Sequence, residues 1–512
     1  GVALVVGLLV VLPLVRALSA PLHVGTSLQW LTGFGLFWAV RLRPDAARRA
    51  VPWLVGVGCA ETVLALAQAA GLPWPVPPVL VRHLGAPGTL SNPNWLAAVL
   101  APLLPLLLSA RVRVRLRSSA FVLIAAGLAV TRSRGAILAA AVGCAALWLA
   151  GFRARRTAFT GPALTAGGLA FVAGVTAVLR ALPGGIPGLG GRVFLWSAAL
   201  ALVREHPWTG VGLGGFAPAF PTVAATVLRA SAFGTFPLGA VELAHNSYLQ
   251  LAAEAGLPAV CAFVILLLWG LVRGFRAPAT RPPAAALLVL AVHALVDGPF
   301  QTAAGLVLFF FLLGLVFPTP DPRPEARRTY PGRSLALGIS ALLLVNGARL
   351  VSAGVFWARA EAARASGRAE RSLTWANRAA ATAPEYGPLR SFRAQALVAA
   401  GRPREALQEL DRARQLWFSL SDWYQYGTLL AALRERDEAF RFWDATARSF
   451  PPLVRPHLEL GRLYEQAGHP DAAGREYRLV LQSSQPTPAA ESARQSAARR
   501  LVALRAAPLG RE

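Results

Sequence analysis

Long apolar runs separated by short arginine-containing segments are the feature that most constrains this chain. Hydrophobic residues make up 55% of its 512 residues and charged residues only 15%, whereas about a quarter of the residues in soluble proteins are charged. The acidic residues are unevenly spread, with 8 in residues 1–352 and 17 in residues 353–512. We therefore predict a transmembrane domain over residues 1–352 and a water-soluble domain over residues 353–512.

The first domain is predicted to be a polytopic bundle of helices, because helices satisfy their own backbone hydrogen bonds within a bilayer. The sequence has no Met, even at position 1, which leaves room for one further helix in a longer N-terminus. The predicted fold is thus all-α, with about 11–12 transmembrane helices. The apolar segments behind this prediction are 1–18, 23–40, 51–71, 94–110, 119–133, 135–151, 160–180, 257–273, 282–300, 303–317 and 334–352.

Arginine clusters between these segments predict the orientation. If the helices alternate in direction, five clusters share one face, which the positive-inside rule assigns to the cytoplasm. The large loop 181–256, the loop 72–93 and the soluble domain then lie on the periplasmic side of a bacterial inner membrane. This placement also explains the net charge of +26 without a nucleic-acid partner. The clusters are Arg41–Arg49, Arg111–Arg117, Arg153–Arg156, Arg273–Arg281 and Arg323–Arg333.

The soluble domain repeats with a period near 34 residues. Successive repeats carry Gly, Gly, Arg and Gly at spacings of 34, 33 and 34, and each is followed five residues later by a small residue. This pattern resembles the tetratricopeptide repeat, in which the small residue lets two helices pack closely. The resemblance implies an α-solenoid with a partner-binding groove; a structural spacer is the alternative. The residues are Gly367, Gly401, Arg434 and Gly468, then Ser372, Ala406, Ala439 and Ala473.

Prolines mark the expected ends of the repeats. Pro384 and Pro451 each follow the small residue by twelve positions, where the second helix should stop. Residues 486–512 are predicted to form a capping helix and a tail.

Cysteine and acidic patterns exclude several classes of site. Cys59, Cys144 and Cys261 lie in apolar segments and show no CxxC spacing, so we predict neither a disulfide framework nor a metal site. The sequence has no D-x-D motif, which argues against a metal-dependent nucleotide-sugar enzyme. We therefore expect no metal and no cofactor.

Polar residues at the predicted outer surface fall into four groups. Basic residues are disfavoured on that side, so Arg132 and Arg134 indicate an anion-binding role. Arg192 begins an apolar piece, 191–206, that we expect to lie against the membrane interface. The glycine run 210–216 predicts a tight backbone turn against a ligand or another helix, since no strand precedes it as a dinucleotide fingerprint requires. His245 stands before a predicted membrane helix, where an imidazole can accept a hydroxyl proton.

These groups, in this order, resemble the O-antigen ligase or Wzy-type family. The resemblance covers about residues 88–316 and implies transfer of a glycan from a polyprenyl-pyrophosphate carrier to an acceptor hydroxyl, without ATP or metal. The motifs are SNPN at Ser91–Asn94, SRG at Ser133–Gly135, the GR…W…HPxxGxGxGxF run at Gly191–Phe216, HNSYLQ…E.G at His245–Gly256, and HALVDGPF at His293–Phe300.

The resemblance and the chemistry of the side chains together assign the predicted roles. Guanidinium groups grip a pyrophosphate bidentately, so Arg134 and Arg192 would stabilise the leaving group. His245 would be the general base, and a single displacement would invert the anomeric centre. The predicted substrate-binding residues are Arg132, Ser133, Asn246, Tyr248, Asn94 and Asp297, the last of which would orient an arginine.

Other functions remain open at this stage. The acceptor is a lipid core for a ligase, another glycan for a polymerase, or a protein side chain for an oligosaccharyltransferase. A membrane transporter is an alternative of another class, although we find no pair of interrupted helices in matching positions. A non-catalytic membrane anchor would leave His245 without a purpose. Glu61, an acid inside an apolar segment, has no assigned role.

Overall fold

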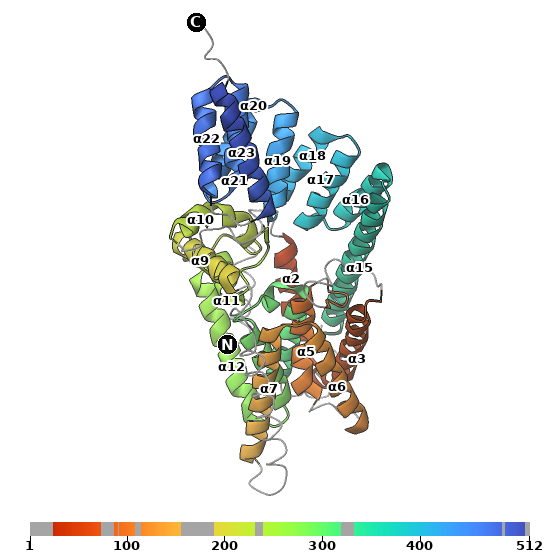
Figure 1. Ribbon diagram of the computed structural model, residues 1–512. Helices are drawn as coiled ribbons and strands as arrows, with labels where there is room; N and C mark the ends of the chain where they lie inside the picture. The colour runs from red at the N-terminus through yellow and green to blue at the C-terminus, as the bar shows by residue number, and fades with distance from the viewer. Residues whose placement is uncertain are drawn as a thin grey trace. The chain divides into compact units, whose positions relative to one another are not determined.

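The computed structural model describes residues 24–72, 86–90, 92–107, 114–154, 189–230, 239–318, 332–483 and 487–506. Most of these residues are helical, and the two strands among them are two residues long each (Figure 1). The predicted all-α fold is therefore confirmed.

The chain divides into two compact units. The first comprises residues 1–187, 206–214 and 243–358, and the second comprises residues 188–205, 215–242 and 359–512. The C-terminal part of the second unit begins at residue 359, and the predicted domain boundary at residue 352 stays a prediction. Residues of the predicted outer loop are shared between the two units.

The first unit holds the apolar helices and begins the long helix α15, which continues past residue 358. Nine of the eleven predicted segments overlap its helices, whereas segments 1–18 and 160–180 lie outside the described residues. Its elements are α2 (Val24–Leu42), α3 (Pro44–Ala69), α5 (Pro93–Leu107), α6 (Val114–Val130), α7 (Arg134–Ala154), α11 (Ser247–Ala255), α12 (Leu257–Arg276), α13 (Arg281–His293), η2 (Pro299–Gln301), α14 (Ala303–Val316) and α15 (Gly332–Ala365).

Three helical stretches are long and apolar enough to cross a membrane: Pro44–Ala69, Arg134–Gly151 and Leu257–Arg276. Pro93–Leu107, Leu116–Val130 and Ala303–Val316 are shorter apolar helices. The full number of spans stays a prediction.

One predicted segment is wrong at its end. Segment 282–300 was expected to be a single helix, but α13 ends at His293 and residues 294–302 form turns and the short η2. Pro299 lacks a backbone N–H and disfavours helical geometry in the residue before it, which prevents α13 from continuing. This break brings Asp297 into a turn.

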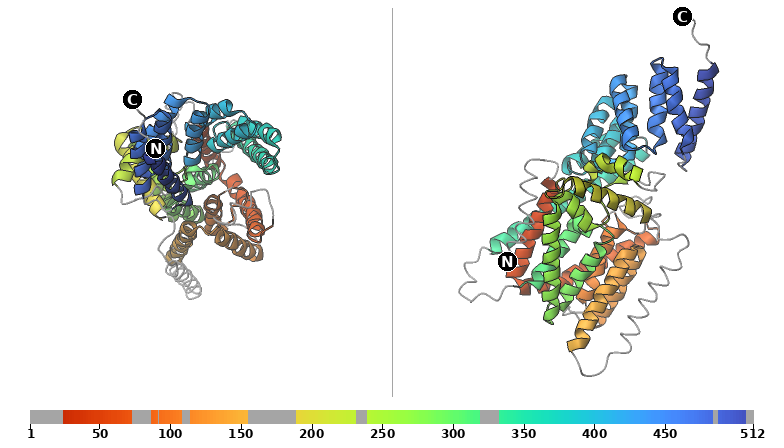
Figure 2. Two further views of the ribbon diagram at one scale, coloured as in Figure 1. Left: turned by 45° about the horizontal axis from the view of Figure 1, so that its top comes forward. Right: turned by 90° about the vertical axis from the view of Figure 1, so that its left-hand side faces the viewer.

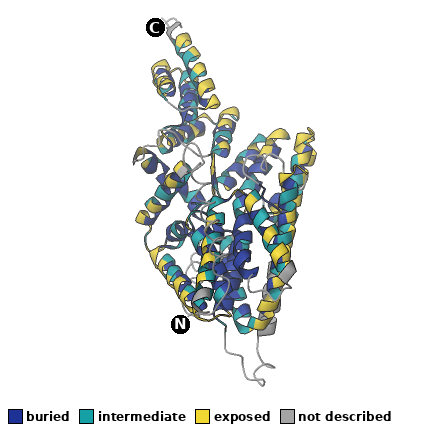
Figure 3. Cartoon of the chain, turned by 60° about the horizontal axis from the view of Figure 1, so that its bottom comes forward, coloured by how far each residue is buried: buried dark blue, intermediate teal, exposed yellow. Residues whose placement is uncertain are grey.

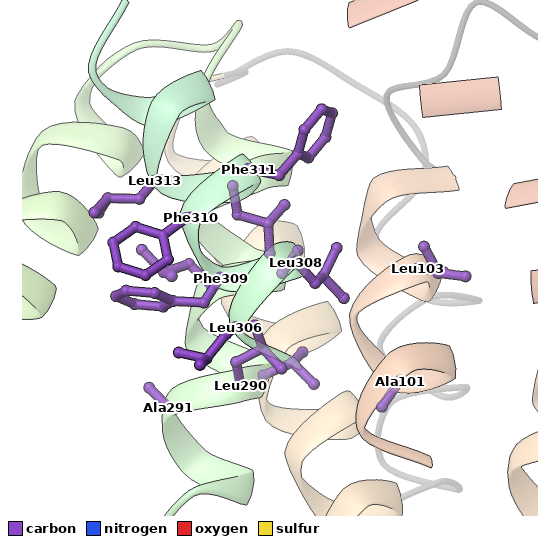
Figure 4. Close-up of a cluster of buried hydrophobic side chains, with 14 of the residues drawn as sticks. Ala101, Leu103, Leu290, Ala291, Leu306, Leu308, Phe309, Phe310, Phe311 and Leu313 are labelled. Carbon is purple, nitrogen blue, oxygen red and sulfur yellow. The ribbon is translucent and has the colours of Figure 1, made fainter. Parts of the chain in front are cut away.

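The core of the first unit is aromatic and aliphatic. Figure 4 shows Phe309 and Phe310 of α14 on the side of that helix away from Ala101 and Leu103 of α5, and all four belong to one buried cluster. Close helix contact requires glycine at two places: a Cβ at Gly33 would lie 2.2 Å from Phe310, and one at Gly314 would lie 2.7 Å from Val40. These glycines let α2 and α14 approach closely, as small residues do between membrane helices.

The second unit stacks the repeat helices in antiparallel pairs, and buried positions line the inner side of each helix (Figures 2 and 3). It also contains two helices and a strand from the predicted outer loop. Its elements are α9 (Leu189–Glu205), α10 (Phe216–Ala230), β1 (Ala240–Val241), α16 (Ala369–Thr382), α17 (Gly387–Ala399), α18 (Pro403–Arg414), β2 (Phe418–Ser419), α19 (Leu420–Ala432), α20 (Arg436–Ser449), α21 (Val454–Gln466), α22 (Pro470–Gln482) and α23 (Pro488–Ala506).

The repeat pattern is confirmed position by position. All four turn residues adopt the left-handed conformation, with φ of 71° at Gly367, 73° at Gly401, 64° at Arg434 and 78° at Gly468. The helices α16 and α20 end two residues before Pro384 and Pro451, as predicted. The small residues Ser372, Ala406, Ala439 and Ala473 are fully buried.

The last helix caps the stack. Ala490, Ala493 and Ala497 of α23 pack against the buried side chains of α21 and α22, including Tyr477. The predicted capping helix is therefore confirmed, while residues 507–512 lie outside the described residues.

Candidate functional site

His245 lies in a strained turn at the start of α11. Its φ is 51°, a left-handed value that a residue with a Cβ rarely adopts. Asn246 holds this turn as the N-cap of α11, because its side-chain oxygen accepts hydrogen bonds from the N–H groups of Tyr248 and Leu249. Such strain persists only where the surroundings impose it, and it is commonest at functional sites.

A buried carboxylate holds the imidazole. Nδ1 of His245 lies 3.3 Å from Oδ1 of Asp297, whose side chain is 4% exposed while that of His245 is 32% exposed. Asp297 also accepts a hydrogen bond from the Gly298 N–H at 2.8 Å. A proton on Nδ1 satisfies the carboxylate and leaves Nε2 as the ring's acceptor. Asp297 therefore contacts His245, and its predicted role in orienting an arginine stays a prediction.

The turn is fixed by a network that the sequence analysis missed. Gln250 accepts a hydrogen bond from the N–H of Ala244 and donates one to Glu254, both at 2.9 Å. Ser247 donates to Gln301 at 2.7 Å, and its N–H donates to the carbonyl of Asp297 at 3.2 Å. Because Gln250 and Ser247 are buried, these bonds fix the backbone on both sides of His245.

Asn246 and Tyr248 are both engaged within the protein. The amide of Asn246 donates to the carbonyl of Leu295 at 2.9 Å, in addition to its capping bonds. The hydroxyl of Tyr248 donates to the carbonyl of Ala291, also at 2.9 Å. The structure thus gives each a role in holding α11 against the end of α13, and their substrate contacts stay a prediction.

The glycine run packs against the end of α11. The N–H groups of Val211 and Gly212 donate to the carbonyls of Ala253 and Glu254 at 2.9 and 2.8 Å. A Cβ at Gly210 would lie 2.2 Å from the backbone of Glu254, and φ at Gly210 is 61°. The run therefore satisfies carbonyls at the C-terminal end of a helix. This confirms the predicted backbone turn against another helix.

Arg132 and Arg134 lie at the start of α7. Arg132 is exposed and left-handed, with φ of 57°, and Arg134 is the first residue of the helix. Ser133 between them is buried, and its N–H donates to the hydroxyl of Thr131. The first turn of α7 has no acidic residue. Two guanidinium groups at the positive end of a helix favour an anionic ligand.

The start of α7 lies against the turn that carries Asp297. A Cβ at Gly135 would lie 2.5 Å from the side chain of Val296 and 3.5 Å from that of His293. Within the first unit, the structure therefore brings the SRG triplet to the same end as the His245–Asp297 pair. From the sequence, the SRG triplet and His245 were placed on the same side only by the predicted membrane topology.

Hydrogen bonds hold the short loop before α5 against α3 and α6. Glu61 of α3 accepts hydrogen bonds from the N–H and the hydroxyl of Thr89. Two turns later on the same helix, Gln68 exchanges two bonds of 2.9 Å with the backbone of Gly88. The N–H of Ala86 donates to the carbonyl of Val130, the last residue of α6. Glu61, unassigned from sequence, thus holds the loop next to the turn that carries Arg132.

Asn94 and Arg192 are the remaining predicted site residues. Asn94 is in the first turn of α5, and its N–H donates to the side chain of Asn92. Ser91 of the SNPN stretch lies outside the described residues. Arg192 is half-buried on α9 in the second unit, so its predicted partnership with His245 stays a prediction.

No group of three or more His, Cys, Asp or Glu side chains among the described residues has an arrangement that could hold a metal ion. The chemistry that these residues offer is proton acceptance by an oriented imidazole beside cationic groups.

Parts of the chain are similar to known proteins. The O-antigen ligase family model matches residues 119–264, a range that contains Arg132, Arg134, Arg192 and His245. No curated protein matches the chain. Among solved structures, a tetratricopeptide-repeat protein with an unusual peptide-binding site, YrrB, is 19% identical, with a TM-score of 0.25 over 33% of this chain and 84% of its own. Residues 119–264 are therefore similar to the O-antigen ligase family.

Proposed function

We propose that the protein transfers a glycan from a polyprenyl-pyrophosphate carrier to an acceptor hydroxyl at the periplasmic face of the inner membrane. The observation that carries this proposal is the His245–Asp297 pair, held at the same end of the first unit as the start of α7. The O-antigen ligase domain supports the class of reaction.

The proposed reaction is a single displacement. The acceptor oxygen attacks the anomeric carbon while its proton passes to Nε2 of His245. The bond between the anomeric carbon and the pyrophosphate oxygen breaks, and the electron pair leaves with the polyprenyl pyrophosphate. Because attack and departure occur on opposite faces, the anomeric configuration inverts. No nucleotide or metal takes part in this scheme.

The cationic residues act on the leaving group. Pyrophosphate gains negative charge as the glycosidic bond breaks, and guanidinium groups bind such oxygens with two parallel hydrogen bonds. We assign this role to Arg134 and Arg192, with Arg132 in support. Asp297 keeps the imidazole in the tautomer that accepts a proton at Nε2 and stabilises the imidazolium that forms.

The acceptor is proposed to be a lipid core, as in a ligase. A polymerase or a protein oligosaccharyltransferase would use the same displacement on a different hydroxyl. The groove of the repeat domain remains the proposed site for a protein partner.

A reconstituted transfer assay tests the proposal. Purified protein in detergent is given a polyprenyl-pyrophosphate glycan and candidate acceptors, without ATP and with a chelator. We expect transfer by the parent protein and a loss of roughly 10²–10⁴-fold in His245→Ala and Arg192→Ala. His457→Ala in the repeat domain is the matched control. Full activity of both site variants would refute the assigned roles.

A further inference from the structure

Part of the predicted outer loop is built into the repeat domain. We call α9, α10 and β1 the outer arm. In the second unit, β1 pairs antiparallel with β2, with Ala240 opposite Ser419 and Val241 opposite Phe418. The N–H of Leu420 donates to the carbonyl of Gly239 at 2.8 Å. The outer arm is therefore hydrogen-bonded to the connection between two repeats.

Aromatic rings continue this contact. The ring of Phe220 on α10 lies 5.3 Å from that of Phe418 and 5.8 Å from that of Phe194 on α9. Phe418 also contacts Trp423 and Phe450 of the repeats, at 5.5 and 5.3 Å. Phe194, Phe220 and Phe450 are fully buried and Phe418 is 1% exposed. One continuous aromatic cluster therefore joins both helices of the outer arm to the repeats.

The repeat that receives the outer arm departs from its neighbours at the contact. Phe418 follows the small residue Ala406 by twelve positions. Pro384 and Pro451 stand at this spacing in the two neighbouring repeats, and Gln485 stands there in the last repeat. A proline has no N–H to offer a strand partner and too small a ring to fill the cluster. The repeat that contacts the outer arm thus differs from both of its neighbours at the docking point.

Arg192 lies on α9, the helix against which α10 packs. The buried stripe of α9 contains Leu195, Ala198, Ala199 and Leu202, and Arg192 precedes Leu195 by three residues, at the edge of the stripe. If α10 were released, the buried stripe of α9 would lose the helix that it packs against. We would then expect the side chain of Arg192 to lose its fixed orientation.

We propose that the repeat domain is the scaffold of the outer arm and thereby positions Arg192 for the lipid-linked donor. Phe220 and Phe418 are positioning residues in this scheme. The inference rests on the proposed function for its consequence in catalysis, but the docking itself does not. A repeat domain that is only a spacer, or only a groove for another protein, would tolerate the loss of either ring.

Hydrogen–deuterium exchange on the full-length protein tests the docking. In Phe220→Ala we expect amides of α10 and β1 to exchange about tenfold faster or more, while those of α21 and α22 are unchanged. Phe392→Ala, which removes a buried ring from α17, is the matched control and should leave α10 protected. Unchanged protection of α10 in Phe220→Ala would overturn the inference.

Transfer kinetics test the consequence. Phe220→Ala should raise KM for the donor and lower transfer toward the level of Arg192→Ala, and Arg192→Ala combined with Phe220→Ala should be little worse than Arg192→Ala alone. Loss of α10 protection with unchanged transfer would overturn the positioning role. Full transfer by Arg192→Ala would instead refute the role proposed for Arg192, and exchange would still decide the docking.

A second variant guards against misfolding. Phe418→Pro installs the residue that the two neighbouring repeats carry at this spacing, and Pro451→Ala is its control. We expect Phe418→Pro to release α10 and to reduce transfer with the repeats still helical by circular dichroism. Protected α10 in this variant would also contradict the scaffold role.

Discussion

Two segments of one predicted loop carry site residues, and different parts of the molecule hold them. His245 is fixed by the first unit through Asp297, Ser247 and Gln250. Arg192 lies on α9, which belongs to the second unit and packs against α10, the helix that contacts the repeats. Two residues of one predicted loop can therefore be supported by different units of the structure.

The largest expected effect is on the His245 side. Asp297→Asn should lower kcat by roughly 10²–10⁴-fold, because an amide can present its N–H to Nδ1 and favour the tautomer that lacks a free acceptor at Nε2. KM for the donor should change little. Steady-state transfer kinetics measure both constants.

Asp45→Asn is the control for this variant, since Asp45 is an exposed carboxylate of the first unit far from α11 in sequence. If Asp297→Asn turns over as fast as the parent protein, the carboxylate does not orient a catalytic base. That result would remove the distinction drawn between the two segments.

A smaller effect is expected where Glu61 accepts hydrogen bonds from Thr89 in the first unit. Glu61→Ala removes two hydrogen bonds to Thr89 and should raise KM for the donor about tenfold, the effect of losing roughly 1.4 kcal/mol of binding. Glu61→Gln keeps a carbonyl for the N–H of Thr89 and an amide for its hydroxyl, so it should behave nearly as the parent.

Val63→Ala, at an exposed apolar position of the same helix, controls for damage to α3. Equal losses in Glu61→Gln and Glu61→Ala would mean that the charge itself is required. Labelling of Ala86→Cys from outside measures how firmly the loop is held without any transfer assay, because Ala86 is buried when the loop is held.

The smallest effect is expected on the stability of the repeats in the second unit. Arg434 adopts the left-handed conformation that glycine supplies in the other three repeats. Arg434→Gly should raise the free energy of unfolding by about 0.5–1 kcal/mol, since glycine meets no Cβ penalty there. Thermal unfolding of the detergent-solubilised protein measures the change.

Arg434→Ala keeps the Cβ and should give no such gain. Neither variant should alter transfer, because Arg434 lies outside the outer arm and the first unit. A lower Tm for Arg434→Gly would show that the arginine side chain contributes more than its backbone costs.

The features that were predicted correctly depend on the backbone geometry and packing of residues close together in the chain. The repeat turns follow from glycine's access to positive φ, and the buried small residues follow from the spacing at which two helices cross. The glycine run 210–214 was likewise predictable as a close backbone approach, since a Cβ at Gly210 has no room. Each of these depends on residues within one or two turns of chain.

Long-range contacts account for the features that were not predicted. Asp297 follows His245 by 52 residues, and only the break after α13 turns its carboxylate toward the imidazole. Asn246 and Tyr248 were predicted as site residues because they adjoin His245. In the structure they donate hydrogen bonds to the carbonyls of Leu295 and Ala291. Sequence proximity gave no signal that separated a capping residue from a ligand.

An apolar helical domain, the helical repeats and the residue types that could carry the chemistry were predictable from sequence, because hydrophobic periodicity and glycine geometry act locally. The contact of Asp297 with His245, the hydrogen bonds of Glu61 to the loop before α5 and the pairing of the outer arm with the repeats appear only in the folded chain. These outcomes depend on hydrogen bonds and ring contacts between residues 28 to about 200 positions apart, which form only after the helices have packed.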